Sequence, residues 1–372
     1  MKECMSKLIY PIATLSGTII GVGLFSLPYI TSRVGIWVMF GYFLVLGSLV
    51  VVSHLFYGEL DLKTPDFKRL PGFAKFHLGD SGEKVAIVST ILGTFGAILA
   101  YLIVGGEFLT NLLSPIFGGN NLIYTLLYFS LGTGLIFFGI KVISRIEFWG
   151  LVLFFIVLIV IFWRGLPFLR IENLLIRGGD MGEFFLPFGP ILFSLWGADL
   201  IPEIEEMLGG KKELIRKIIP VAILIPALVY LFFIFLILGI TGPQTTESAL
   251  TGLRNFLGDG IVSLGLLFGV VSTFTSFIAL GLTLRKVFWY DLKIEKNWAW
   301  GITCFLPLIL FLIGVKNFIP VISFSGGIML GINGILILLM YQKIKPQKKF
   351  LSYPLILIFL GGIIYEIIYF FR

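Results

Sequence analysis

Long apolar runs dominate this sequence and restrict the folds that it can adopt. A bilayer core about 30 Å thick is crossed by a helix of about 20 apolar residues. Because lipid offers the backbone no hydrogen-bond partner, such a run must be helical to cross. The runs predict eleven spans, over residues 8–30, 34–56, 85–113, 121–140, 144–164, 184–206, 216–240, 260–284, 298–315, 318–341 and 350–371.

Composition agrees with an all-α integral membrane protein. Hydrophobic residues make up 58% of the 372 residues, charged residues make up 13%, and the mean hydropathy is +1.02. With two histidines and two cysteines, Cys4 and Cys304, the chain offers neither a metal cluster nor a catalytic constellation. We therefore expect no enzyme and no cofactor. The longest loop, residues 57–84, is expected to carry a short amphipathic helix in the membrane interface.

The net charge of +7 is explained by topology and requires no nucleic-acid partner. With eleven spans, 21 of the 28 Lys and Arg residues fall on the loops of one side and 7 on the other. Basic loops stay on the cytoplasmic side, which predicts a cytoplasmic N-terminus and an extracytoplasmic C-terminus in a plasma (inner) membrane. The expected partners are the lipid bilayer and a small molecule, with no obligate protein partner.

The first span contains a stretch that disfavours a continuous helix. Residues 16–28 read SGTIIGVGLFSLP, with Gly17, Gly21, Gly23 and Pro28 inside the apolar run. Unwound backbone is tolerated at membrane depth only where protein buries it or where it lines a cavity. Close packing of small residues is the alternative explanation for Gly17 and Gly21.

The sixth span, residues 184–206, is interrupted in the same way by three prolines and two glycines. It also carries Asp199, whose charge needs a partner or water at this depth. Two halves of five helices, each opening with a broken helix, indicate an inverted-repeat transporter with its site at the midplane. We expect one transmembrane domain over residues 1–372, with repeats at about 8–164 and 184–341 and an extra helix at 350–371.

Four stretches carry a resemblance to a known family. They read GTIIGVGLFSLPYI in the first span, GTFGAILAYLIVGGEFL in the third, LPFGPILFSLWGADLIPEIEEM in the sixth and VVSTFTSFIALGLTLRKVF in the eighth. Together they resemble the amino acid/auxin permeases of the amino acid, polyamine and organocation superfamily. The resemblance implies a LeuT-type fold, with helices 1 and 6 discontinuous, and secondary active transport of amino acids by alternating access.

The broken helices then supply a substrate site. Free N–H groups of Gly21, Val22 and Gly23, at the positive end of a half-helix, are expected to bind the substrate carboxylate. The freed carbonyls of the sixth span, helped by Asp199, are expected to bind the amino group. Trp196 and Tyr101 are expected to line the side-chain pocket, although membrane aromatics also serve plain packing. The carbonyl residues are Phe193, Ser194 and Leu195.

The resemblance also implies a sodium site between the first and eighth helices. Its ligands would be the carbonyls of Gly17, Ile20 and Ser272 and the hydroxyls of Thr275 and Ser276. Residues at spacings of three and four share a helical face, but Ser and Thr hydroxyls can instead bond within their own helix. Proton-coupled members of the superfamily can place a fifth-helix lysine at this position, and residues 146–163 hold no basic residue. Na⁺ is therefore the expected coupling ion, with H⁺ carried by Asp199, or an amino-acid sensor, as alternatives.

Overall fold

The computed structural model describes residues 2–65, 69–139, 143–175, 181–208 and 212–370, and every regular element within these ranges is helical. The first span is broken. Helix α1 (Lys2–Ile19) ends before Gly21, whose φ of −126° and ψ of −159° are extended. The 3₁₀ turn η1 (Val22–Ser26) and helix α2 (Leu27–Val34) follow, with Pro28 in the first turn of α2. The two halves meet at 49°.

The sixth span is broken as well. Helix α7 (Phe188–Leu195) ends at Trp196, which is extended with ψ of 126°. The chain continues through Gly197 and the 3₁₀ turn η5 (Ala198–Leu200) into helix α8 (Ile201–Leu208). The sequence therefore predicted correctly that helices 1 and 6 are discontinuous.

The remaining elements fill the other predicted spans. They are α3 (Ile36–Lys63), α4 (Leu70–Phe117), α5 (Asn121–Phe138), α6 (Ile143–Gly165), α9 (Ile215–Thr241), the short α10 (Arg254–Leu257), α11 (Asp259–Lys286), α12 (Lys296–Leu312), α13 (Phe318–Ser323), the π-helical η10 (Phe324–Leu330), α14 (Gly331–Ile344) and α15 (Lys349–Phe370). Within the described ranges, seven helices are long and apolar enough to cross a membrane, and the bent first pair makes an eighth. Residues 140 and 371, at the ends of two predicted spans, lie outside the described residues.

Helix α4 differs most from the prediction, because it begins at Leu70 and not at residue 85. The amphipathic segment expected in the 57–84 loop forms its first turns. Phe73 is buried there while Phe76 is 54% exposed. Gly79, with φ of +78°, marks the joint between this segment and the membrane-spanning part. Residues 66–68 of the same loop lie outside the described residues.

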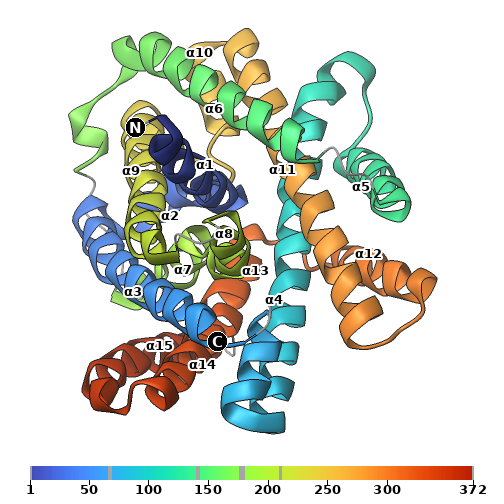
Figure 1. Cartoon of the computed structure of the whole chain (residues 1–372). Coiled ribbons are helices and arrows are strands. Elements are labelled where there is room, and N and C mark those ends of the chain that lie inside the picture. The colour runs from blue at the N-terminus through green and yellow to red at the C-terminus, as the bar shows by residue number, and fades with distance from the viewer. Residues whose placement is uncertain (1, 66–68, 140–142, 176–180, 209–211, 371–372) are drawn as a thin grey trace.

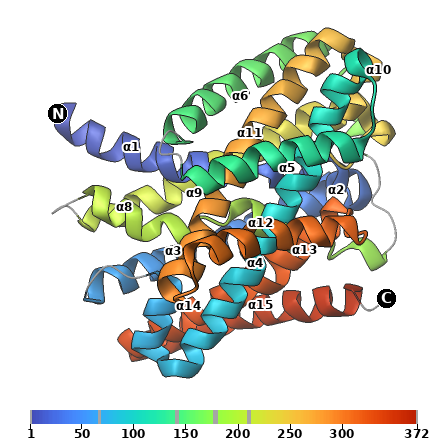
Figure 2. The same cartoon turned by 90° about the vertical axis from the view of Figure 1, so that its right-hand side faces the viewer.

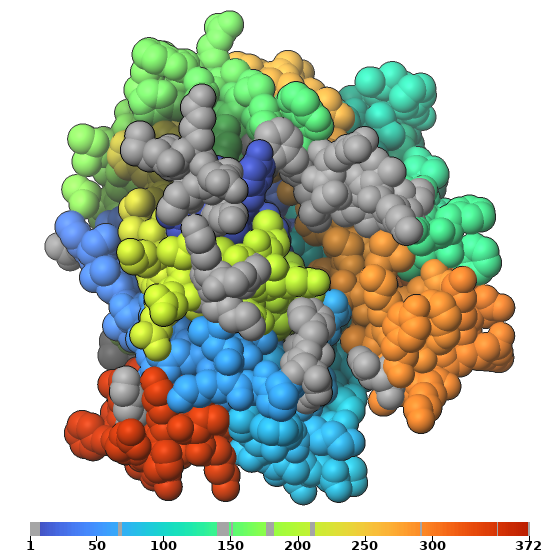
Figure 3. Space-filling model, viewed as in Figure 1, coloured from blue at the N-terminus to red at the C-terminus, as the bar shows by residue number. Residues whose placement is uncertain are grey.

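The helices form one bundle in which α4 and α11 pack along each other, with α1, α3 and α9 on one side and α5 and α12 on the other (Figure 1). The start of α1 and the end of α15 lie on opposite faces (Figure 2). We name these the N-terminal face and the C-terminal face. The N-terminal face, on which α8 and the start of α4 adjoin, is the one seen in Figure 3. Its cytoplasmic location and the division into two repeats stay predictions.

Candidate functional site

The two helix breaks meet at one cavity of about 350 Å³. Seven of the nine residues predicted for the substrate site line it: Gly21, Gly23, Tyr101, Phe193, Ser194, Trp196 and Asp199. The other two, Val22 and Leu195, are fully buried and are not among its lining residues. The cavity also includes Arg69 and Glu203, which are partly exposed, so it reaches the N-terminal face.

At the first break, the backbone lies against side chains from other helices. The Val22 N–H donates to the Tyr101 hydroxyl at 3.4 Å, a long bond that leaves this donor weakly engaged. A Cβ on Gly21 would lie 2.5 Å from the Tyr101 hydroxyl, and a Cβ on Gly23 would lie 2.2 Å from the Ser194 Oγ. Glycine at both positions is what allows α4 and α7 to approach the break this closely.

The second break is held by a histidine. The Gly197 N–H donates to Nε2 of His54 at 2.9 Å, and His54 on α3 is completely buried. Since Nε2 accepts this bond, the ring is neutral with its proton on Nδ1. The same ring meets Trp196 edge-on, with 5.0 Å between centroids. His54 thereby orients both residues that interrupt the sixth span.

Tyr230 of α9 reaches both breaks. Its hydroxyl lies 2.6 Å from the Ile19 carbonyl oxygen and 3.0 Å from the Ser194 carbonyl oxygen. These carbonyls belong to the last turns of α1 and α7, where a helix leaves its carbonyls without partners. One side chain therefore joins the ends of the two half-helices.

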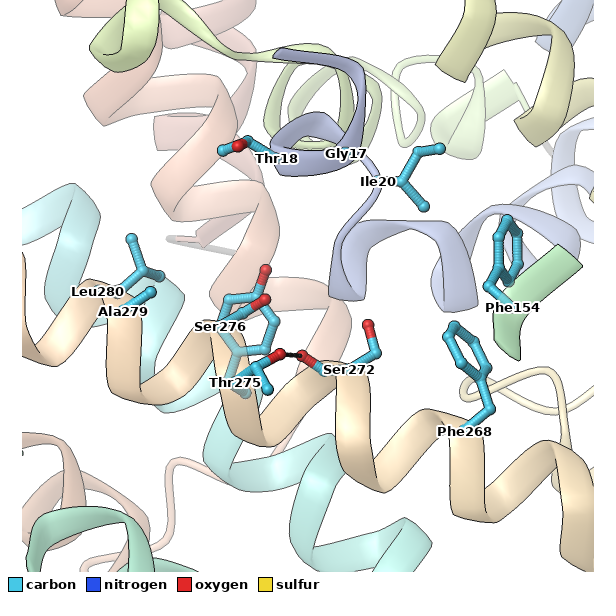
Figure 4. A pocket seen from close by; sticks show the side chains of 11 residues that line it. Gly17, Thr18, Ile20, Phe154, Phe268, Ser272, Thr275, Ser276, Ala279 and Leu280 are labelled. Atoms are coloured by element: carbon cyan, nitrogen blue, oxygen red, sulfur yellow. Dashed lines mark hydrogen bonds between the residues drawn. The ribbon is translucent and has the colours of Figure 1, made fainter. Parts of the chain in front are cut away.

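The residues predicted to bind sodium line a second cavity of about 110 Å³, which has room for a water-sized species. Gly17, Ile20, Ser272, Thr275 and Ser276 all belong to its lining. Figure 4 shows the serine side chains projecting from α11 toward the end of α1. Thr275 donates its hydroxyl to the Ser272 carbonyl at 3.0 Å, which is the bond within one helix that was the alternative expectation, and Thr275 still belongs to the lining of the cavity.

The two cavities share a wall formed by Thr18, Tyr101, Ala279 and Leu280. A ligand in one would therefore be separated from a ligand in the other by single side chains. Among the described residues, no three His, Cys, Asp or Glu side chains are grouped so that they could hold a metal ion. Any cation at this site would have to be held by neutral oxygens, which suits a hard monovalent ion.

The breaks are closed toward the C-terminal face. Phe25 follows the first break and is buried among Phe108, Phe233 and Phe268, with centroid distances of 4.9, 6.2 and 6.2 Å. Farther out, Arg33 at the end of α2 forms an ion pair with Glu183, which precedes α7. On the opposite face, Arg69 pairs with Glu203 at 3.0 Å. The site is thus plugged on one side and reached by a cavity from the other.

Two of the residues that organise the breaks, His54 and Tyr230, were not predicted from the sequence. Each is a polar group inside an apolar helix, which was the signal available. Their partners lie 143 residues away for His54, and 211 and 36 residues away for Tyr230, so no local spacing could identify them.

Two broken helices facing one cavity in an all-helical membrane bundle define the LeuT-type fold. The fold matches MhsT in complex with L-phenylalanine, with a TM-score of 0.60 and 14% identity over 95% of this chain and 98% of that one. It also matches Mhp1, a nucleobase-cation-symport-1 family transporter in a closed conformation with bromovinylhydantoin bound, with a TM-score of 0.67 and 13% identity over 96% of this chain and 90% of that one.

The family follows from the sequence match. The model of the tryptophan/tyrosine permease family covers residues 5–371, and the chain belongs to that family. Tyrosine-specific transport system 1 of Haemophilus influenzae is 25% identical over 347 residues, which span 87% of this chain and 84% of that protein. The expected amino acid transporter is confirmed, whereas nothing in these matches points specifically to the amino acid/auxin permeases.

Proposed function

We propose that the chain carries aromatic L-amino acids across the membrane by alternating access. The observation that supports this most is the single cavity on which both helix breaks converge, in a chain of the tryptophan/tyrosine permease family. Phe193, Trp196 and Tyr101 give the cavity aromatic walls, and the small residues Gly93 and Ala97 of α4 also line it. The tyrosine-specific relative and the phenylalanine bound to MhsT support the same substrate class.

The polar ends of the substrate would be held by the breaks. The N–H groups of Gly21, Val22 and Gly23 begin a half-helix and would bind the carboxylate, with the Tyr101 hydroxyl beside them. Carbonyls at the end of α7 would accept hydrogen bonds from the ammonium group, and the exposed Asp199 in the same cavity would add its negative charge. The aromatic ring would then lie between α4 and Trp196.

We further propose that Na⁺ is the coupling ion and that it binds in the cavity lined by Gly17, Ile20, Ser272, Thr275 and Ser276. What supports this is an uncharged lining between α1 and α11, in which every polar side chain carries a hydroxyl group, with space for one small species. Proton coupling through Asp199 is the alternative, because this carboxyl group lines the substrate cavity.

Uptake in proteoliposomes tests these proposals. Radiolabelled tyrosine, tryptophan and phenylalanine should accumulate against a gradient when Na⁺ is imposed outside, while leucine and glutamate should not. Accumulation that persists with Na⁺ replaced by choline, and that collapses on adding a protonophore, would exclude sodium. Binding of an aromatic amino acid without any accumulation would identify a sensor and contradict transport.

A further inference from the structure

The hydroxyl of Tyr230 contacts one backbone carbonyl from each of the two broken helices. It lies within hydrogen-bond distance of the carbonyls of Ile19 and Ser194, and the whole side chain is excluded from solvent. Ile19 and Ser194 line the substrate cavity, but Tyr230 lines neither cavity. Tyr230 therefore contacts these two carbonyls from behind the site and acts on a ligand through neighbouring groups, without touching it.

A carbonyl oxygen has two lone pairs, so a bond from Tyr230 leaves each carbonyl able to accept a second donor. A hydroxyl has one proton, and two acceptors at 2.6 and 3.0 Å share it. Because one donor fixes both oxygens, the ends of α1 and α7 are held at a set separation. A ligand with several N–H donors is the chemical partner for such a pair.

We propose that Tyr230 is a positioning residue that aims the Ile19 and Ser194 carbonyls at the ammonium group of the substrate. The inference rests on the proposed function and extends it, since the ammonium would then be shared by both half-helices, with Ile19 added to the amine site. Without the hydroxyl, each helix end relaxes separately and the ammonium loses its aligned acceptors. Hydrogen bonds to charged groups are the stronger class, so the loss should fall on ligands that carry the amine.

The ring of Tyr230 makes a separate contribution. It packs against Phe43, with 6.5 Å between centroids, and this contact survives replacement by phenylalanine. Tyr230→Phe therefore removes the hydroxyl and keeps the packing. Tyr124→Phe is the matched control, because the Tyr124 hydroxyl also donates to a carbonyl, that of Gly118 at 2.5 Å, near the start of α5 and apart from the breaks.

The test is equilibrium binding to the purified full-length protein. Tyr230→Phe should raise the Kd for L-tyrosine by about tenfold or more, the effect of losing a hydrogen bond to a charged group, while Tyr124→Phe leaves it unchanged. The inhibition constant of 3-(4-hydroxyphenyl)propionate, which has the carboxylate and ring but no amine, should be equal in the wild type and in Tyr230→Phe. 4-Aminophenylalanine at position 230 restores a donor and should recover most of the affinity.

Several outcomes overturn the proposal. An unchanged Kd for Tyr230→Phe does so, as does an equal loss for tyrosine and for the amine-free acid, which would indicate a general structural role. If Tyr230→Phe lowers the melting temperature too far for binding to be measured, the 4-aminophenylalanine variant decides, and its failure to bind tyrosine counts against the proposal. A wild-type protein that binds no aromatic amino acid contradicts the proposed function itself.

Discussion

Gly23 lies nearer to the second broken helix than any other residue type would permit. A Cβ at this position would meet Ser194 at 2.2 Å from Oγ and 3.1 Å from Cα. Rotation of the serine side chain can relieve the first contact but not the second, because Cα belongs to the backbone of α7. The glycine therefore fixes how closely the first break approaches α7 at the substrate site.

We expect Gly23→Ala to weaken aromatic amino acid binding by about tenfold or more, since displacement of the break by a few tenths of an ångström misaligns its N–H groups. Gly134→Ala on α5 is the control, because the added methyl group there meets nothing within 4 Å. Binding assays on both purified variants make the comparison. Partial recovery in Gly23→Ala combined with Ser194→Gly would attribute the loss to this contact, and wild-type affinity of Gly23→Ala would contradict it.

For individual residues, the sequence predicted where helices 1 and 6 break. It did not predict which side chains form hydrogen bonds with the backbone groups exposed at the breaks. Gly21, Gly23 and Trp196 stand in motifs that can be read locally, and all three line the cavity. Glu366 shows the opposite case. It is 1% exposed and lies against Gly189 and Gly327, residues from two other spans, so its burial depends on tertiary packing that no local pattern encodes.

Among the elements, α11 separates its hydroxyl groups by face. Thr275 and Ser276 line the smaller cavity, whereas Thr273, two residues before Thr275, is completely buried outside it and donates to the Gly269 carbonyl at 2.7 Å. The helical period of 3.6 residues places neighbours in sequence on different sides of the helix. One helix thus offers both a candidate ligand and its matched control.

Thr275→Ala should raise the Na⁺ concentration needed for half-maximal uptake by about tenfold. This magnitude assumes that losing one Na⁺ ligand oxygen costs as much free energy as losing one hydrogen bond to a charged group. Substrate binding at saturating Na⁺ should change much less. Thr273→Ala should leave the Na⁺ dependence as it is, because its hydroxyl faces away from the cavity. The measurement is uptake as a function of Na⁺ concentration, and equal effects of the two variants would exclude this face of α11 as the ion site.

Helix boundaries were less predictable than helix faces. Apolar periodicity located the span within α4, but the turns from Leu70 onward carry charged residues and read as loop. The π-helical η10 also escaped prediction, although residues 323–327 of the apolar run from 318 to 341 read SFSGG. In both cases packing against other helices determines the backbone conformation, because tertiary contacts override the local helix propensity of the sequence.

For the whole molecule, each of the two faces carries an ion pair between segments that flank the breaks. Arg33–Glu183 lies at the C-terminal face, and Arg69–Glu203 joins the start of α4 to α8 at the N-terminal face. Exposed fractions of 28–49% place these side chains among partly exposed pairs, which contribute about 0–1 kcal/mol each. Removing one pair should shift the balance of open and closed states by up to about fivefold.

Reactivity of a cysteine placed at Thr94 in the cavity reports this balance, in a protein that lacks Cys4 and Cys304. With a membrane-impermeant thiol reagent supplied at the N-terminal face, Glu203→Gln should speed modification and Glu183→Gln should slow it. Glu83→Gln removes an ion pair with Lys75 inside the surface segment of α4 and should change nothing. A change of the same sign for Glu203→Gln and Glu183→Gln would show that the two pairs do not act on opposite faces.

The hydrogen bonds at the two helix breaks also matter for the step of the proposed transport cycle in which the carrier returns without substrate. His54, Tyr101 and Tyr230 supply hydrogen-bond partners to four backbone groups at the breaks, with no ligand required. In the proposed alternating-access cycle, a carrier in which these four groups are already hydrogen-bonded depends less on substrate to hold its breaks together, so we expect it to return empty. Net transport then does not require a second substrate molecule to bind on the opposite side of the membrane. This favours net flux in one direction over obligatory exchange.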